Sequence, residues 1–172
     1  MVRASTPTVR PVVIAGIILG VGLGGFVDGI VLHQMLQWHH MLTAYDHHHY
    51  PATTITGLEV NTLWDGIFHA STWVATALGL GMLWRAAGVR GVRWSGRALV
   101  GALAAGWGGF NLVEGIIDHQ ILGIHHVRDD LGGPLSWDVG FLVFGALLVL
   151  VGWVLIQQSA EQRRAVRDAR AR

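Results

Sequence analysis

Residues 12–36 read VVIAGIILGVGLGGFVDGIVLHQML, a nearly continuous apolar run that carries one acid, Asp28, and ends shortly after His33. A helix of about 20 apolar residues is long enough to cross the hydrocarbon core of a bilayer. Three further runs of this kind occupy approximately residues 61–84, 98–122 and 136–157. Because the runs are continuous rather than short and alternating, they predict helices and not the strands of a barrel. We therefore expect an all-α integral membrane protein, a bundle of four transmembrane helices.

The composition agrees with a membrane location. Hydrophobic residues make up 52% of the 172 residues and charged residues 13%, against about 25% charged residues in a typical soluble domain. The chain has no cysteine, which excludes disulfide scaffolds and thiolate metal sites. It also lacks the G-x-S-x-G, Walker A and H-E-x-x-H motifs of common hydrolases and nucleotide-binding enzymes.

Gly16, Gly20 and Gly24 recur every four residues and predict close packing of the first helix against a neighbour.

The distribution of arginine predicts the orientation in the membrane. All 12 basic residues are arginine, and 11 of them lie before the first span, between the second and third spans, or after the fourth. The positive-inside rule makes that side cytoplasmic, so we expect a multi-pass protein of a bacterial inner (plasma) membrane with both termini in the cytoplasm. Residues 1–11 and 158–172 would be cytoplasmic segments, and residues 43–60 and 124–135 would be outer loops. The arginine-rich tail fits anionic lipid and not nucleic acid.

The two halves of the chain repeat one motif. Residues 28–40, DGIVLHQMLQWHH, align without gaps to residues 114–126, EGIIDHQILGIHH. The repeats of about 12–84 and 98–157 each contain two spans, so the first and third helices should run in the same direction. We expect two parallel two-helix repeats related by a pseudo-two-fold axis along the membrane normal.

Histidines and acids within the spans are the candidate site. Counting about 1.5 Å per residue from Trp38 and Trp64 puts His33 and His69 at one depth. His119 is the repeat partner of His33 and belongs at the same level, so the three could converge on an ion. Ionisable groups inside a bilayer are costly and indicate function by default. We predict a metal site with these three histidines as ligands and Asp65 as a further ligand. The other members of the predicted site are Asp28, Glu114, His40 and His126.

Helical phase limits how the acids can act. Asp28 and His33 are five residues apart and lie about 140° apart around an ideal helix. We therefore expect Asp28 and Glu114 to support histidines on neighbouring helices, unless the glycine after each acid bends the backbone. Imidazole and carboxylate ligands suit a transition-metal ion, copper or zinc first and iron as an alternative. The structural alternative is that these groups only hydrogen-bond the helices together.

The expected outer loops contain more histidine, in the pairs His39–His40 and His125–His126 and in the run from residue 47 to residue 49. These side chains could form a vestibule that collects metal above the buried site. A polar, partly solvated loop is the alternative interpretation.

The stretches 25–41 and 111–130 resemble a family of bacterial predicted membrane proteins, catalogued as domain of unknown function 2243. The resemblance covers roughly residues 10–157. Members of that family are often encoded beside assembly factors of haem–copper oxidases, which implies copper handling and respiratory oxidase assembly components as partners. The resemblance implies no activity. A metal-dependent membrane enzyme (a hydrolase or a diiron oxidase), a haem b protein and a purely structural subunit remain open alternatives.

Overall fold

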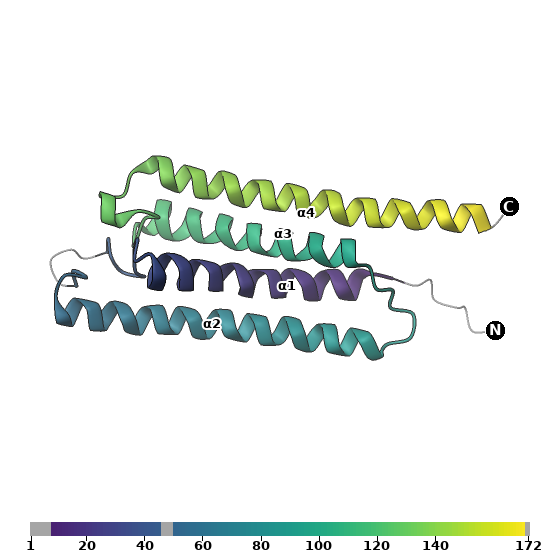
Figure 1. The fold of residues 1–172 in the computed structure, drawn as a ribbon, viewed down its shortest axis with the longest axis horizontal. Helices are drawn as coiled ribbons and strands as arrows, with labels where there is room; N and C mark the ends of the chain where they lie inside the picture. Colours follow the sequence, from purple (N-terminus) through teal and green to yellow (C-terminus); the bar gives the residue numbers. More distant parts are fainter. Residues whose placement is uncertain (1–7, 46–49, 171–172) are drawn as a thin grey trace.

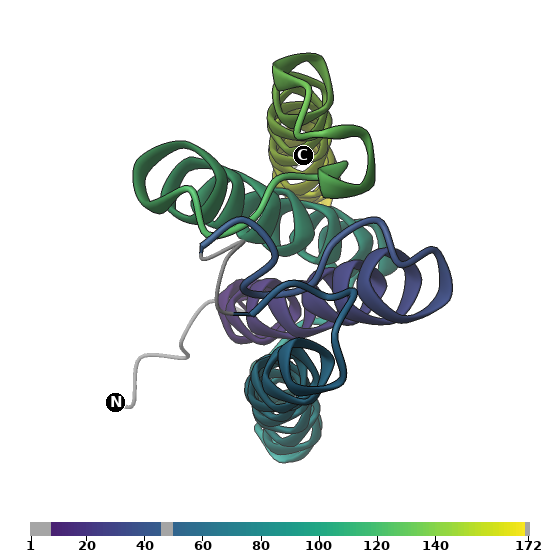
Figure 2. The ribbon, with the colours of Figure 1, turned by 90° about the vertical axis from the view of Figure 1, so that its left-hand side faces the viewer.

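The structure is a computed structural model that describes residues 8–45 and 50–170. Its four long helices lie side by side in a row, in the order α2, α1, α3, α4 (Figures 1 and 2). Two of them continue as π-helices, and a short 3₁₀ helix lies between the third and fourth. The elements are α1 (Arg10–Phe26), η1 (Val27–Met35), α2 (Ile55–Gly88), α3 (Gly96–Glu114), η2 (Gly115–Leu122), η3 (Asp129–Leu131) and α4 (Leu135–Arg170).

The four helices are long and apolar enough to cross a membrane, over Arg10–Met35, Ile55–Gly88, Gly96–Leu122 and Leu135–Gln162. This confirms the predicted all-helical architecture with four spans. The second helix begins at Ile55 rather than near residue 61, because Thr54 caps its first turn by accepting a hydrogen bond from the backbone N–H of Gly57 at 3.1 Å.

The helices form a row and not a square bundle, so the inner pair makes most of the helix contacts. The most apolar windows of the spans that contain α1 and α3 are 50% and 39% buried, whereas those of α2 and α4 are 11% buried. The outer helices therefore present their apolar faces to lipid. The buried interior that can hold polar groups lies between α1 and α3 and along the inner sides of the outer helices.

Glycine allows α1 and α3 to pack backbone against backbone. A Cβ atom at Gly20 would overlap the carbonyl of Leu103, and a Cβ at Gly106 would overlap the carbonyl of Ile17. Small residues permit this close approach between membrane helices. The glycine stripe predicted from the sequence is therefore a packing surface.

The two ends of the molecule differ. The start of α1, the end of α4 and the connection from α2 to α3 lie at one end, and the other two connections lie at the opposite end (Figure 1). At this second end, here called the loop end, the backbone N–H of Ala44 bonds to the carbonyl of Ile124 at 2.9 Å. The N–H of Asp130 bonds to the carbonyl of Trp38 at 3.1 Å. The two connections are thus joined into one cap over the helix ends.

Candidate metal centre

The chemistry of the chain is concentrated where α1 and α3 change into π-helices near the loop end. In a π-helix the backbone hydrogen bond spans five residues rather than four, and at the end of η1 the N–H of Leu36 bonds to the carbonyl of Val31 at 2.8 Å. A turn of this width brings residues five apart onto the same side. Asp28 Oδ2 consequently lies 3.1 Å from Nε2 of His33.

The second repeat has the same geometry in η2. Oε1 of Glu114 lies 2.8 Å from Nε2 of His119. The sequence-based expectation that an acid and a histidine five residues apart point in different directions was wrong, because it assumed an α-helix throughout. The sequence analysis left open that the glycine after each acid bends the backbone locally. The structure shows such a local change in both repeats.

Asp65 on α2 connects the first repeat to its loop through four hydrogen bonds. Its carboxylate accepts from Nδ1 of His33 at 3.0 Å and from Nδ1 of His40 at 2.6 Å. It also accepts from the side chain of Gln34 at 3.2 Å and from the backbone N–H of Met41 at 2.9 Å. Asp65 was predicted to be a metal ligand, but here its oxygens orient two imidazoles.

Asp138 on α4 has the equivalent role in the second repeat. It lies 3.4 Å from Nδ1 of His119 and 2.7 Å from Nδ1 of His126. The side chain of Gln120 donates to it at 3.3 Å, and the backbone N–H of Val127 donates at 3.0 Å. Each contact of Asp138 therefore corresponds to a contact of Asp65 at the matching position of the first repeat.

His39 and His125 cross between the repeats. Nδ1 of His39 donates to the carbonyl of Val127 at 3.1 Å, and Nδ1 of His125 donates to the carbonyl of Met41 at 3.2 Å. Their rings stack at a centroid distance of 4.8 Å, with 3° between the planes. Both side chains are buried, at 2% and 0% exposure. They lie at the centre of the site and not in a solvated vestibule, because the loop end folds back over the helices.

Nδ1 of His33, His39 and His125 is thus hydrogen-bonded to an acceptor, and Nδ1 of His119 lies 3.4 Å from Asp138 without a hydrogen bond. Nε2 of His33, His119 and His125 contacts Asp28 or Glu114, and Nε2 of His39 has no partner among the described residues. Hydrogen bonding through Nδ1 is the usual arrangement of metal-binding histidine, in which a carboxylate or carbonyl fixes the ring and the tautomer. The four rings and the two acids of the π-helices are here called the central cluster. Its members are Asp28, His33, His39, Glu114, His119 and His125.

Two inward atoms of the central cluster have no hydrogen-bond partner among the described residues. They are Oε2 of Glu114 and Nε2 of His39, whereas Nε2 of His33 and Nε2 of His119 contact the acids Asp28 and Glu114. An unsatisfied buried polar group costs about 1–3 kcal/mol, and a bound ion is one way to satisfy such groups. Because the orphaned atoms gather in one place, the residues present fit a bound metal ion.

Two groups of three ligand atoms are spaced for an ion. One atom from each of His33, His39 and His125 lies within 4.8 Å of the others, and so does one from each of Glu114, His119 and His125. His125 belongs to both groups, and its Nε2 lies 2.8 Å from Oε1 of Glu114.

The charge of the region also favours a cation. Four carboxylates are buried there with at most 7% exposure: Asp28, Asp65, Glu114 and Asp138. Among the described residues their ion-pair partners are all histidines. The nearest arginine in sequence, Arg128, pairs instead with Asp130 at the loop end. Buried carboxylates require protonated histidine or a metal ion for balance.

The loop histidines of the central cluster differ in basicity. Burial lowers the pKa of His39 well below its usual value, and the neighbouring His125 lowers that pKa further. Burial also disfavours the charged form of His125, but its hydrogen bond with Glu114 raises the pKa of His125 overall. The lowered pKa favours the neutral, metal-binding form of His39, whereas the raised pKa of His125 means that a metal ion must displace a proton there.

His69 is not part of the central cluster. Its Nδ1 donates to the backbone carbonyl of Asp65 at 2.7 Å, and its ring contacts Phe26 and Phe68. Phe68 is the α2 side chain that stacks on His33, with centroids 5.5 Å apart. The structure thus brings together His33, His119, Asp28 and Glu114 of the predicted set, and places His40 and His126 on the supporting carboxylates.

Two central members, His39 and His125, were expected only in the vestibule, and Asp138 was not predicted to take part. The internal repeat could have identified all three residues, because His39 and His125 occupy matching positions in the two halves and Asp138 matches Asp65. The predicted vestibule residues 47–49 lie outside the described residues.

A family model described as predicted membrane protein (DUF2243) matches residues 15–159. The chain belongs to this family. The matched region contains the whole central cluster and both supporting carboxylates. No curated protein and no solved structure matches the chain. The family description thus agrees with the four membrane-length helices and names no activity.

Proposed function

We propose that this protein is an integral membrane metalloprotein, with a transition-metal centre formed by the central cluster. The observation that carries the proposal is the set of four buried imidazoles gathered around two buried carboxylates, with three of the rings held by hydrogen bonds through Nδ1. If these polar groups served only to hydrogen-bond the helices together, the contacts of Asp65 and Asp138 would be sufficient. That role gives no reason for further buried atoms that lack partners.

The donor set favours zinc or copper(II). Imidazole and carboxylate suit Zn²⁺, Cu²⁺, iron and nickel, whereas Cu⁺ prefers thiolate and thioether ligands. The chain has no cysteine. The resemblance to a family associated with haem–copper oxidase assembly makes copper the first ion to test, with zinc second and iron third.

The centre suits a resident ion more than a transient cargo. Three of the four rings are held by a hydrogen bond through Nδ1, and the rings of His39 and His125 join the two repeats to each other. Release of the ion would leave orphaned polar atoms in a buried site. A role in copper handling or in oxidase assembly would then depend on the loaded centre, with assembly components of the oxidase as partners at the loop end.

The central cluster lies near the outer face of the bacterial inner membrane in this proposal. Among the described residues the loop end carries a single arginine, Arg128, and the opposite end carries Arg10, Arg85, Arg90, Arg93 and Arg97. The positive-inside rule supports a cytoplasmic location for the second group. A reporter fused after Arg172 should be active in the cytoplasm, and periplasmic activity would reverse the orientation.

The test of the metal proposal is elemental analysis of protein purified without chelator and with a tag that contains no histidine. We expect a stoichiometric transition metal in the unmodified protein and its loss in the His33→Ala and His119→Ala variants. His69→Ala is the matched control, because it removes an intramembrane histidine outside the cluster. An electron paramagnetic resonance signal would assign Cu²⁺. A Soret band, or equal metal content in all variants, would contradict the proposal.

A further inference from the structure

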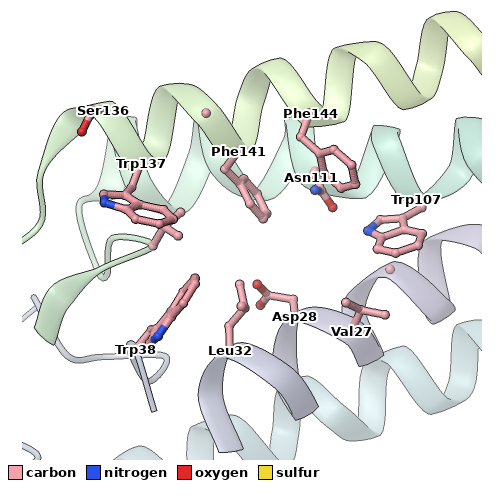
Figure 3. A pocket seen from close by; sticks show the side chains of 13 residues that line it. Val27, Asp28, Leu32, Trp38, Trp107, Asn111, Ser136, Trp137, Phe141 and Phe144 are labelled. Carbon is pink, nitrogen blue, oxygen red and sulfur yellow. The ribbon is translucent and has the colours of Figure 1, made fainter. Parts of the chain in front are cut away.

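A cavity of about 330 Å³ lies beside the central cluster, between α1 and its continuation η1 on one side and α4 on the other (Figure 3). Trp38 and Trp137 form its wall near the loop end, and Trp107 closes the other end. Phe141 and Phe144 project into it from α4. The cavity is thus bounded by flat aromatic faces.

Two polar side chains point into this otherwise apolar space. Asp28 enters from η1 and Asn111 from α3 (Figure 3). Both are buried, at 4% and 2% exposure, and Oδ1 of each has no hydrogen-bond partner among the residues that the structure describes. Asp28 turns its other oxygen, Oδ2, to His33. A ligand in the cavity would therefore meet two unpaired acceptors.

The cavity is reached from the lipid. Val27, Trp137 and Phe144 line it and are 39%, 41% and 45% exposed, and all three belong to membrane-length helices. Their exposed surface faces hydrocarbon when those helices span the bilayer. A molecule that enters here is therefore dissolved in the membrane.

Size, shape and polarity restrict the class of ligand. A cavity of about 150 Å³ accommodates a benzene molecule, so this one holds a ring together with the beginning of a substituent. Indole and phenyl faces favour a flat aromatic partner. Two acceptor oxygens require a ligand that donates a hydrogen bond, and the bilayer interior penalises a charged donor. A neutral hydroxyl on an aromatic ring meets all of these requirements.

We infer that this cavity binds a lipid-soluble phenol, whose hydroxyl donates a hydrogen bond to Oδ1 of Asp28 or Asn111 while the ring lies between the aromatic walls. The site adjoins the proposed metal centre through Asp28. It goes beyond the proposed function and does not depend on a metal being bound.

The probe for a binding test is 2-bromo-4-octylphenol, because bromine quenches tryptophan fluorescence and three tryptophans line the cavity. Titration into the full-length protein in lipid nanodiscs should give saturable quenching that unbrominated 4-octylphenol reverses. Bromo-octylbenzene, which lacks the hydroxyl, should give only the linear quenching of a probe dissolved in lipid. Tighter competition by octylammonium than by 4-octylphenol would overturn the assignment to a phenol.

Gly140→Leu blocks the cavity directly. Gly140 lines the cavity, and a Cβ atom there would meet no other atom within 4 Å, so the larger side chain extends into open space. We expect at least about a tenfold loss of phenol affinity, equivalent to 1.4 kcal/mol, with metal content unchanged. Gly81→Leu on α2 is the matched control, because its Cβ also has open space and it lies outside the cavity.

Asn111→Leu tests the polar contact. The two side chains are similar in size, so the variant removes hydrogen bonding without opening space. We expect phenol affinity to fall about 2–10-fold, while the weak response to bromo-octylbenzene stays the same. Unchanged saturable quenching in Gly140→Leu, or equal saturable binding of both probes by the unmodified protein, would refute the inference. A protein that loses its metal but still binds the phenol would contradict only the proposed function.

Discussion

His39 and His125 come from opposite halves of the chain and stack face to face at 4.8 Å, each donating Nδ1–H to a backbone carbonyl of the other repeat. The pair lies where the two repeats meet. Its geometry fixes the position of two Nε2 atoms through contacts that no single helix could supply. The centre is thus a property of the assembled repeats rather than of a motif on one helix.

This pairing predicts that His39→Ala and His125→Ala remove metal as completely as His33→Ala does. The reason is that each change deletes an oriented ligand and also the bridge between the repeats. Metal content per chain, measured by elemental analysis of the monodisperse fraction, is the readout. Near-normal metal content in both variants would move the proposed centre away from the contact between His39 and His125.

The shared ligand His125 predicts one metal ion per chain. His125 belongs to both groups of ligand atoms, and its Nδ1 contacts the carbonyl of Met41, so its Nε2 can bind a single ion. Titration of chelator-treated protein with Zn²⁺, followed by calorimetry, should saturate at one equivalent. Saturation at two equivalents would mean that each repeat holds an ion of its own without sharing His125.

Metal binding should weaken as the pH falls. A histidine ligand must be neutral to bind, and the hydrogen bond with Glu114 raises the pKa of His125 above the usual value of about 6.5, so protons begin to compete with the ion above that pH. The apparent affinity should decrease about tenfold per pH unit for each imidazole that must lose a proton. Competition against a chelator of known affinity from pH 8 to pH 5 measures this slope. A flat profile would exclude histidine as the main ligand.

Packing between α1 and α3 predicts that Gly20→Val destabilises the protein. The added atoms would meet the carbonyl of Leu103, and overpacking of this kind costs about 1–3 kcal/mol. The temperature at which the protein aggregates in detergent should fall. Gly81→Val has open space around its Cβ and is the control that should remain close to the unmodified protein.

The four spans and the repeat could be predicted from the sequence, because hydropathy and residue-for-residue alignment depend on no tertiary information. His33 and His119 followed from the same alignment. The contact between Asp28 and His33 could not be predicted, since it depends on a π-helical turn and the calculation assumed 100° per residue. His69 was included because it matched the others in depth, but depth does not determine which side of a helix a residue occupies.

The loop histidines show a second limit of sequence reasoning. His39 and His125 follow the last turn of a span, where a solvated loop is the usual expectation. The chain instead folds back, and Asp65 and Asp138 hold the returning segments through the backbone N–H of Met41 and Val127. Only the duplication of the His–His pair indicated that these positions matter.

The two supporting carboxylates provide the sharpest test of how the centre is built. Asp65 accepts hydrogen bonds from His33 and His40, and Asp138 contacts the equivalent rings of the second repeat. Replacement of either by asparagine retains the shape but turns one acceptor oxygen into a donor, so one imidazole loses its fixed orientation. Loss of such support typically reduces metal affinity about 10–100-fold without abolishing binding.

Asp65→Asn and Asp138→Asn should therefore weaken metal binding by similar factors, measured by chelator competition at constant pH. Asp130→Asn is the control, because Asp130 is exposed and its carboxylate pairs with Arg128 at the loop end, so the metal affinity of this variant should be unchanged. Complete loss of metal in Asp65→Asn, with Asp138→Asn unaffected, would instead make Asp65 a direct ligand, as the sequence analysis predicted. Equal, partial losses would show that the repeats carry matching supports for a shared centre.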